Sequence, residues 1–249
     1  MNRLIINDLC IEVTRRCVMK CAHCMRGEAQ NINLQLDKIN QLFNNNSFDI
    51  IKINRLALTG GEPTLNSEAI IKIVSHIINQ NIKLNAFVMV TNGSNYNQKI
   101  INILNLLYRY YLENEDKNGF NLICSLDQFH KSPSQETLEK YIRLPYFIHN
   151  RITINNNDII CLGRAYENSL GNPKSYYYQQ SLYQQCLKNN LPIIYKYKTG
   201  KISIDKLYLN ARGLYGFHII DATYDMIDSL CTYDQQQIEK MLTKRKTIN

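Results

Sequence analysis

The sequence lacks any apolar run long enough to cross a membrane, and the apolar part of its first eight residues is too short for a signal peptide. It also lacks a Gly/Ser-rich linker and any internal repeat longer than a strand–helix unit. We therefore expect a cytoplasmic protein with no membrane partner. It would be built as one large domain, or as one domain with a small appendage packed against it.

Acidic residues are the scarcer charged class, because 21 Asp and Glu stand against 29 Lys and Arg, giving a formal charge of +8. This excess permits an acidic partner such as nucleic acid, an acidic peptide or an acidic electron carrier, but does not choose among them. The only basic run is Lys244-Arg245-Lys246, and the other lysines are spread over polar segments in a way typical of a solvated surface. The function must be sought in local motifs.

Strand and helix patterns alternate over the first 165 residues or so. Strands are predicted at 8–14, 53–59, 84–91, 120–127, 147–154 and 158–162. Helices are predicted at 34–43, from an N-cap at Ser67 to Ile78, at 96–113 and at 134–144. Six strands with helices between most of them imply an α/β fold with a parallel sheet, either curled like a barrel or open and doubly wound.

The pattern changes after about residue 170. A Tyr-rich segment at 175–180 precedes two predicted strands at 193–198 and 206–210, a turn at 211–213 and a helix at 234–246. We predict a barrel-like domain over residues 1–170 and a small α+β C-terminal appendage over residues 171–249.

Three of the eight cysteines form the pattern Cys17-x3-Cys21-x2-Cys24. In a reducing compartment such clusters are more often metal ligands or catalytic groups than disulfides. Structural zinc needs four ligands, and His23 adjoins Cys24, which makes simultaneous tetrahedral ligation awkward. Three thiolates on a 4Fe-4S cluster would instead leave one iron open to another ligand.

The other five cysteines do not suggest a second cluster. Cys10, Cys124 and Cys161 fall in predicted strands, where a free cysteine usually behaves as a small buried apolar residue. Cys186 and Cys231 are too few and too far apart for an independent cluster. We therefore expect one cluster and a cluster-free appendage.

The cysteine loop after the first strand, followed by Gly60-Gly61-Glu62-Pro63 after the second, resembles the radical S-adenosylmethionine (SAM) superfamily over roughly residues 8–170. The resemblance implies a partial (βα)6 TIM-like barrel. It also implies a 4Fe-4S cluster whose fourth iron is chelated by SAM. Reductive cleavage of SAM would then give methionine and a 5'-deoxyadenosyl radical that abstracts hydrogen from a substrate. An outside electron donor of the flavodoxin or ferredoxin type would be required.

The resemblance assigns roles residue by residue. Cys17, Cys21 and Cys24 match the cluster ligands, with Lys20 and Arg26 offsetting the cluster's charge, and His23 takes the place of an aromatic residue beside adenine. Gly60, Gly61, Glu62 and Pro63 match the turn that meets the amino group of SAM, where missing side chains let the backbone approach. The remaining candidates, at the ends of later strands where barrel enzymes place their sites, are Asn92, Ser125, Asp127 and Arg164. Asp127 and His130 could instead meet the substrate.

The substrate class rests on a second resemblance. Residues 207–213 are similar to the hairpin that begins the C-terminal extension of peptide-modifying relatives, so the expected substrate is a peptide or protein, with a small molecule also open. A glycyl-radical-enzyme activase is one alternative. A zinc-binding, nucleic-acid-binding module is another, but it would explain neither the Gly-Gly-Glu-Pro turn nor the strand–helix alternation. We do not expect a nucleic-acid partner.

Overall fold

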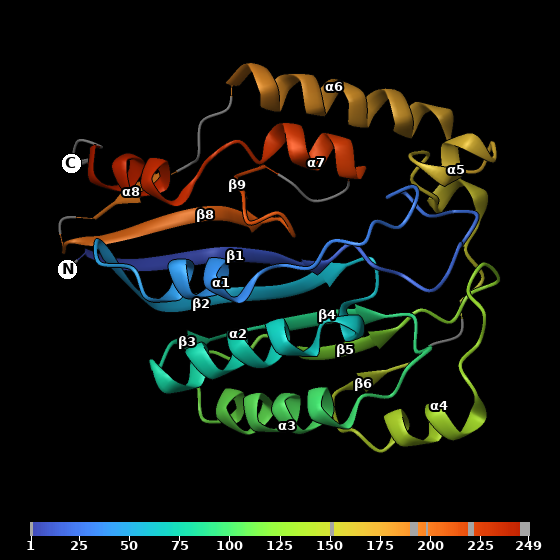
Figure 1. Cartoon of the computed structure of the whole chain (residues 1–249), viewed down its shortest axis with the longest axis horizontal. Coiled ribbons are helices and arrows are strands. Elements are labelled where there is room, and N and C mark those ends of the chain that lie inside the picture. Colours follow the sequence, from blue (N-terminus) through green and yellow to red (C-terminus); the bar gives the residue numbers. More distant parts are fainter. Residues whose placement is uncertain (1, 150–151, 190–193, 198, 219–221, 245–249) are drawn as a thin grey trace.

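The computed structural model describes residues 2–149, 152–189, 194–197, 199–218 and 222–244. In the first part of the chain strands and helices alternate (Figure 1). The elements are β1 (Asn2–Thr14), α1 (Leu36–Phe43), β2 (Phe48–Gly60), the short 3-10 turn η1 (Pro63–Leu65), α2 (Ser67–Asn79), β3 (Lys83–Leu84), β4 (Phe87–Thr91), α3 (Gln98–Leu112), β5 (Phe120–Cys124), α4 (Gln135–Ile142) and β6 (Phe147–Ile148). The predicted α/β class is therefore confirmed.

The later part begins with two short helical segments, η2 (Asn156–Asp158) and α5 (Arg164–Glu167). It continues with α6 (Pro173–Asn189), β7 (Ile194–Lys196), β8 (Lys201–Leu209), β9 (Tyr215–Gly216), α7 (Tyr224–Leu230) and α8 (Gln235–Lys244). The predicted strands 193–198 and 206–210 thus have counterparts in β7 and β8. Four positions of the elements predicted in this later part lie outside the described residues: 193, 198, Arg245 and Lys246. The last two belong to the basic run.

One sheet carries both parts of the chain, with its strands in the order β6-β5-β4-β2-β1-β8-β7. All pairs from β6 to β8 along this path are parallel, and only β7 and β9 pair antiparallel with β8. The path ends at β6 and β7, which do not pair with each other among the described strands. An open, mostly parallel sheet is consistent with a partial barrel, and the segment expected as an appendage contributes β8 to it.

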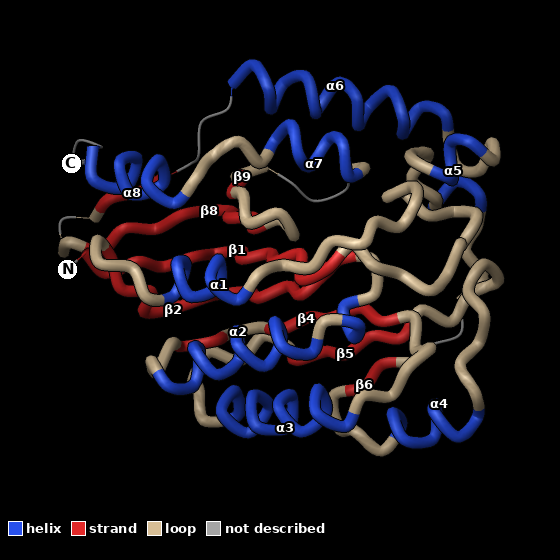
Figure 2. Tube along the Cα trace, viewed as in Figure 1, coloured by secondary structure: helices blue, strands red, loops and turns tan. Residues whose placement is uncertain are grey.

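The carboxyl ends of the parallel strands and the two chain ends lie at opposite sides of the molecule (Figure 1). The strands point toward the side of the view where α5 and the loop after β1 lie, while both chain ends lie at the other side (Figure 1). Loops dominate the first of these sides (Figure 2). Because ligand sites in parallel sheets lie beyond the carboxyl ends of the strands, this loop-rich side is where a site is expected.

The sixth predicted strand, 158–162, is wrong, and the count of six barrel strands is not confirmed. Residues 156–158 form η2, and the next residues run outside the sheet. Their apolar side chains are buried, but Leu162 packs in a cluster with α7 residues such as Tyr224 and Ile227 instead of in the sheet. The Cys161 amide hydrogen-bonds to the Ser175 hydroxyl, so this backbone is satisfied without a strand partner.

Helix α2 begins at Ser67, but the predicted N-cap is wrong by one residue. Asn66 caps the helix, because its side-chain oxygen accepts a hydrogen bond from the Ala69 amide at 3.3 Å. Its side-chain amide also donates to the Val13 carbonyl at 2.7 Å. One asparagine thus satisfies the helix start and ties it to the end of β1, which serine is too short to do.

The main core lies between the sheet and its covering helices. Leu9, Ile11 and Val13 of β1 are fully buried, as are Ile70 and Ile73 of α2. Burial of such side chains is the dominant favourable term in folding, at about 25 cal/mol per Å² of apolar surface. In the described part of the chain, no helix has the length and apolar character needed to cross a membrane.

Candidate functional site

The inner face of the sheet lines a cavity of about 440 Å³. Alternate residues of β2 and β4, including Ala57, Thr59, Val88 and Val90, form part of its wall. This alternation follows from the strand period, because successive side chains point to opposite faces. Cys17, Cys21 and Cys24 line the same cavity, together with Gly60 and Gly61. The two motifs that stand far apart in the sequence therefore share one space.

The cysteines lie on a long loop, residues 15–33, that we call the cluster loop. Its two ends are tied together, because the Arg15 amide donates to the Ile32 carbonyl at 2.8 Å and the Gln30 amide donates to the Arg15 carbonyl at 3.0 Å. The Thr14 hydroxyl also donates to the side chain of Asn33 at 2.7 Å. The loop is closed at its base, so the cysteines are presented on a defined turn.

The three thiols are half-buried and electrostatically coupled. The Cys24 amide donates to the Cys21 carbonyl at 3.1 Å, and the Met19 amide donates to the Cys17 sulfur at 3.4 Å. Burial, then the charges of Cys24 and Cys17, raise the pKa of Cys21 to about 11. Burial also raises the pKa of the Cys17 thiol, so binding a metal to Cys17 and Cys21 would release protons.

The three cysteine sulfurs do not all lie within 4.8 Å of one another. Among the described residues, the one trio of ligating side chains whose ligand atoms all lie within 4.8 Å of one another is His23, Asp127 and His130, and it contains no cysteine. Three thiolates on one tetrahedral ion, with metal–sulfur bonds of about 2.3 Å, would be roughly 3.8 Å apart. At least one pair of these sulfurs is therefore farther apart in the metal-free chain than a single bound ion would hold it.

The Gly60-Gly61-Glu62-Pro63 turn lies directly against the cluster loop. The Gly61 amide donates to the Thr14 carbonyl at 2.8 Å, and the Glu62 amide donates to the Arg16 carbonyl at 2.7 Å. A Cβ on Gly61 would collide with the Arg16 carbonyl oxygen and would stand 2.9 Å from the Arg15 carbonyl oxygen. Glycine is therefore required by this close approach of two backbones.

Glu62 is the acceptor that joins this turn to the end of β4. One carboxylate oxygen accepts hydrogen bonds from the Thr64 amide at 3.1 Å, the Thr64 hydroxyl at 2.6 Å and the Thr91 hydroxyl at 2.8 Å. The other accepts from the Asn92 amide at 2.7 Å. The side chain is 1% exposed, so these four hydrogen-bond donors of the protein take the place of water around the carboxylate. Its predicted contact with SAM stays a prediction.

We expect Glu62→Gln to lower the free energy of unfolding by about 2 kcal/mol. The side-chain NH2 of glutamine would face the N–H of Thr64 or Asn92, and two buried donors would then have no acceptor. Chemical denaturation of the metal-free chain measures this. Glu68→Gln is the control, since Glu68 is exposed in the first turn of α2. Equal stabilities of the two variants would show that the four donors do not depend on a carboxylate.

The ends of β4 and β5 bring two further predicted residues to the cavity. Asn92 and Ser125 both line it. The Asn92 side-chain nitrogen lies 3.8 Å from the Cys17 sulfur, and the Ser125 amide donates to the Thr91 carbonyl at 2.9 Å. Asn92 therefore lies next to Cys17, a predicted cluster ligand, and Ser125 continues the strand pairing past the end of β5.

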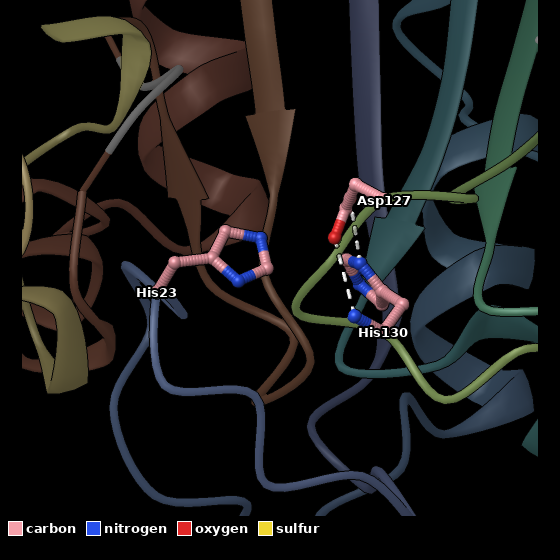
Figure 3. A group of neighbouring side chains, drawn as sticks. All are labelled: His23, Asp127 and His130. Atoms are coloured by element: carbon pink, nitrogen blue, oxygen red, sulfur yellow. Dashed lines mark hydrogen bonds and ion pairs between the residues drawn. The ribbon is translucent and has the colours of Figure 1, made fainter. Parts of the chain in front are cut away.

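His23, Asp127 and His130 converge from two segments at the same side of the molecule (Figure 3). The carboxylate of Asp127 is largely used locally: one oxygen accepts from the Phe129 and His130 amides at 2.9 and 3.1 Å, and the other pairs with His130 Nδ1 at 2.8 Å. His130 lines the cavity with His23, whose ring packs on Phe129 at 4.6 Å. Asp127 thus orients His130.

The hydrogen bonds to Asp127 make stability depend on pH. Burial by itself would raise its pKa, but the bonds from His130 and the Phe129 amide hold the pKa below the ordinary value of 3.8. A depressed carboxyl pKa contributes stability that is present above the ordinary value and lost as pH falls through the folded-state value. We expect Asp127→Asn to cost about 1 to 2 kcal/mol at neutral pH.

This difference between wild type and Asp127→Asn should shrink as the pH is lowered below about 4, where the wild-type carboxyl becomes protonated. Denaturation curves of the metal-free chains at several pH values measure it. A gap that stays constant down to the acid limit would show that the charge of Asp127 adds nothing.

Arg164, another predicted site residue, lies in the run Gly163-Arg164-Ala165, which contacts the cluster loop. Its guanidinium Nε donates to the Cys21 carbonyl at 3.1 Å, and its backbone amide donates to the Cys24 carbonyl at 3.0 Å. Gly163 has a φ of 52°, and a Cβ there would stand 2.6 Å from the Met25 carbonyl oxygen. The run therefore holds the cysteine turn in place and also lines the cavity.

Several residues near the site carried no sequence signal. Glu12, Asp228 and Tyr224 are buried or half-buried around Arg15, although their segments look like an ordinary strand end and an ordinary helix. Arg26, predicted to offset the charge of a cluster, lies 3.7 Å from Glu12 and so already has an acidic neighbour. Only knowledge that β8 pairs with β1 would have placed α7, which carries Tyr224 and Asp228, near Arg15.

Comparisons with known proteins agree with the motif. Residues 11–111 match the family model described as the radical SAM superfamily. Among solved structures, the chain is similar to SuiB of Streptococcus suis bound to the precursor peptide SuiA, at 12% identity and a TM-score of 0.43. The match covers 97% of this chain and 62% of that one, so the chain spans less than two thirds of SuiB.

The chain is also similar to anSMEcpe with bound AdoMet and Cp18Cys peptide. Here the identity is 12%, the TM-score is 0.38, and the match covers 93% of this chain and 81% of the other. No curated protein matches the sequence.

Proposed function

We propose that this chain is a radical SAM enzyme acting on a peptide or protein, and the match of residues 11–111 to the family model of the radical SAM superfamily supports this. Cys17, Cys21 and Cys24 would hold a 4Fe-4S cluster, and SAM would bind at the iron that no cysteine ligates. The observation that carries this proposal is the shared cavity, in which three thiols stand beside the glycine pair.

The residues present suit such a cluster. Three half-buried thiols on one loop supply soft ligands for iron and sulfide. When bound, the cluster and SAM together supply the one-electron cleavage that yields a hydrogen-abstracting nucleoside radical. The protein contributes placement and exclusion of water.

The remaining cavity residues would bind and orient. Gly60 and Gly61 line the cavity beside the cysteines, which supports the proposed contact of this turn with the amino group of SAM. Asn92 and Ser125 offer hydrogen-bonding groups beside them. Val88 and Val90 keep part of the opposite wall apolar, which favours exclusion of water from a radical.

The proposed substrate is a peptide side chain, with a small molecule as the other possibility. A cavity of about 440 Å³ is in the range of ligand sites and admits a side chain more readily than a folded surface. The proposed electron donor is an acidic flavodoxin or ferredoxin, which the formal charge of +8 would attract.

The test is anaerobic reconstitution with iron and sulfide, followed by incubation with dithionite and SAM. We expect 5'-deoxyadenosine and methionine to form in equal amounts, and only when reductant is present. A reconstituted chain that binds iron but forms no 5'-deoxyadenosine would contradict the proposed activity. A chain that takes up one zinc ion in place of iron would favour the zinc-binding alternative. No observation favours an activase.

A further inference from the structure

A group of buried charges joins the cluster loop to the C-terminal part of the chain. At its centre is Arg15, whose side chain is 0% exposed. Its Nε donates to Glu12 at 3.0 Å, and its two terminal nitrogens donate to the two carboxylate oxygens of Asp228 at 3.0 and 2.6 Å. The Arg15–Asp228 pair is bidentate, the geometry in which a guanidinium is held most rigidly.

On the loop side, this group reaches residues before and after the cysteines. Arg15 also donates to the Gln30 side chain at 3.1 Å, so one guanidinium links the two ends of the cluster loop. Arg26, two residues after Cys24, lies 3.7 Å from Glu12. Arg15 itself is two residues before Cys17. A shift of these arginines would therefore displace the cysteines from both directions.

On the C-terminal side, the same charges are held by α7 and by the turn after β8. The Tyr224 ring faces both guanidinium groups, with Arg15 at 4.7 Å and Arg26 at 5.7 Å from the ring centre. The Asn210 side chain donates to Asp228 at 3.1 Å, and the Ala211 amide donates to Glu12 at 3.0 Å. The contacts therefore come from segments about 200 residues away in the sequence.

General stabilisation of the fold does not account for where this group lies. The C-terminal part is already attached to the sheet along β8, which pairs with β1 from Arg3 to Ile11. The charged group lies beyond that pairing, at the base of the cluster loop. Buried ion pairs contribute little net stability but fix geometry, so this placement points to control of the loop's conformation.

We propose that Asp228 and Tyr224 of α7 are positioning residues for the iron–sulfur site. By holding Arg15 and Arg26 they keep the cluster loop in the shape that presents the three cysteines to one cluster. The inference rests on the proposed function. It extends the functional unit well past residue 111, where the match to the family model ends. Helix α7 then supports the cysteine loop.

The test compares Asp228→Asn with Asp225→Asn. Asp225 is an exposed acidic residue on the same helix, so this control makes the same charge change without touching Arg15. Both variants and wild type are reconstituted anaerobically. Three measurements follow: iron retained per chain, the rate of iron loss to a chelator, and the EPR spectrum of the reduced cluster. Thermal unfolding of the metal-free chains provides a temperature at which all of them are folded.

We expect Asp228→Asn to lose iron roughly 10-fold faster than wild type at that temperature, the usual effect of removing an outer-shell partner. Its EPR spectrum should also differ from that of wild type, and Asp225→Asn should match wild type in both. Tyr224→Leu is a second variant on an independent contact, and it should also speed iron loss.

Two results separate the possible failures. If wild type binds a cluster and Asp228→Asn and Tyr224→Leu retain it as wild type does, the positioning role is overturned while the proposed function stands. If wild type itself assembles no cluster, the proposed function fails, and the inference fails with it.

Discussion

Cys21→Ala is expected to leave the chain folded but unable to hold its cluster. Iron after anaerobic reconstitution should fall from about four atoms per chain to less than about one, because only two thiolate ligands remain. Formation of 5'-deoxyadenosine should fall by more than about 100-fold, since loss of an outer-shell partner alone costs about 10- to 100-fold in affinity. Iron and sulfide analysis and product chromatography measure the two effects.

The matched control is Cys186→Ala. Cys186 is a buried cysteine of α6 and does not line the cavity. The Cys186→Ala chain should retain the iron content of wild type. If Cys21→Ala kept four iron atoms, or if Cys186→Ala lost them to the same degree, the assignment of the three cysteines as the cluster ligands would be wrong.

Gly61→Ala is expected to damage both stability and cluster assembly. The added Cβ would collide with the Arg16 carbonyl oxygen and stand 2.8 Å from the Arg16 carbonyl carbon. Neither backbone can move without breaking the bonds that join the turn to the cluster loop, so we expect a loss of about 3 kcal/mol in the free energy of unfolding. The displaced loop should also reduce iron content. Denaturation and iron analysis measure the two effects.

Gly200→Ala separates steric collision from backbone strain. Gly200 has a φ of 75°, but a Cβ there would meet nothing within 4 Å. Gly200→Ala should lower the free energy of unfolding by about 1 kcal/mol, because the left-handed backbone conformation alone disfavours alanine. A Gly61→Ala chain as stable as Gly200→Ala and with full iron content would show that the turn and the loop do not need their close approach.

The apolar pattern of the sequence predicted β1 and β2 correctly. Val13 and Leu9 of β1 and Leu58 of β2 carry the apolar pattern of buried strands, and both strands are present and extend toward the N-terminus beyond their predicted bounds. The strand predicted at 84–91 is divided into β3 and β4. Residue Asn85 between them donates its amide to the Ile53 carbonyl and accepts from the Asn118 amide, which periodicity does not reveal.

The failures have a common cause in tertiary contacts. Leu162 and Cys161 are as apolar as strand residues, but they are buried against α7 and α6, so burial alone did not identify their partner. β8 joins β1 across about 200 residues, and nothing local to residues 201–209 indicates that neighbour. A pattern of alternating burial shows that a segment is covered, but not by what.

The three cysteines that line the cavity were predictable from the sequence, but the contacts that support them were not. Cys17, Cys21 and Cys24 stand in a spacing with a chemical meaning, and the structure brings them to the cavity shared with Gly60 and Gly61. Arg164 was a candidate, but its contact with the Cys21 carbonyl was not predicted, and the support that Asp228 gives through Arg15 comes from a segment whose local sequence has no motif. Their roles toward SAM remain predictions.

The central claim is that three thiolates hold a cluster with one iron left open for SAM. EPR spectroscopy of the reconstituted, dithionite-reduced chain, recorded with and without SAM, tests it most directly. The account predicts a cluster spectrum that changes when SAM is added and that is absent in Cys21→Ala. An identical spectrum with and without SAM would contradict it, because SAM would then not reach the open iron.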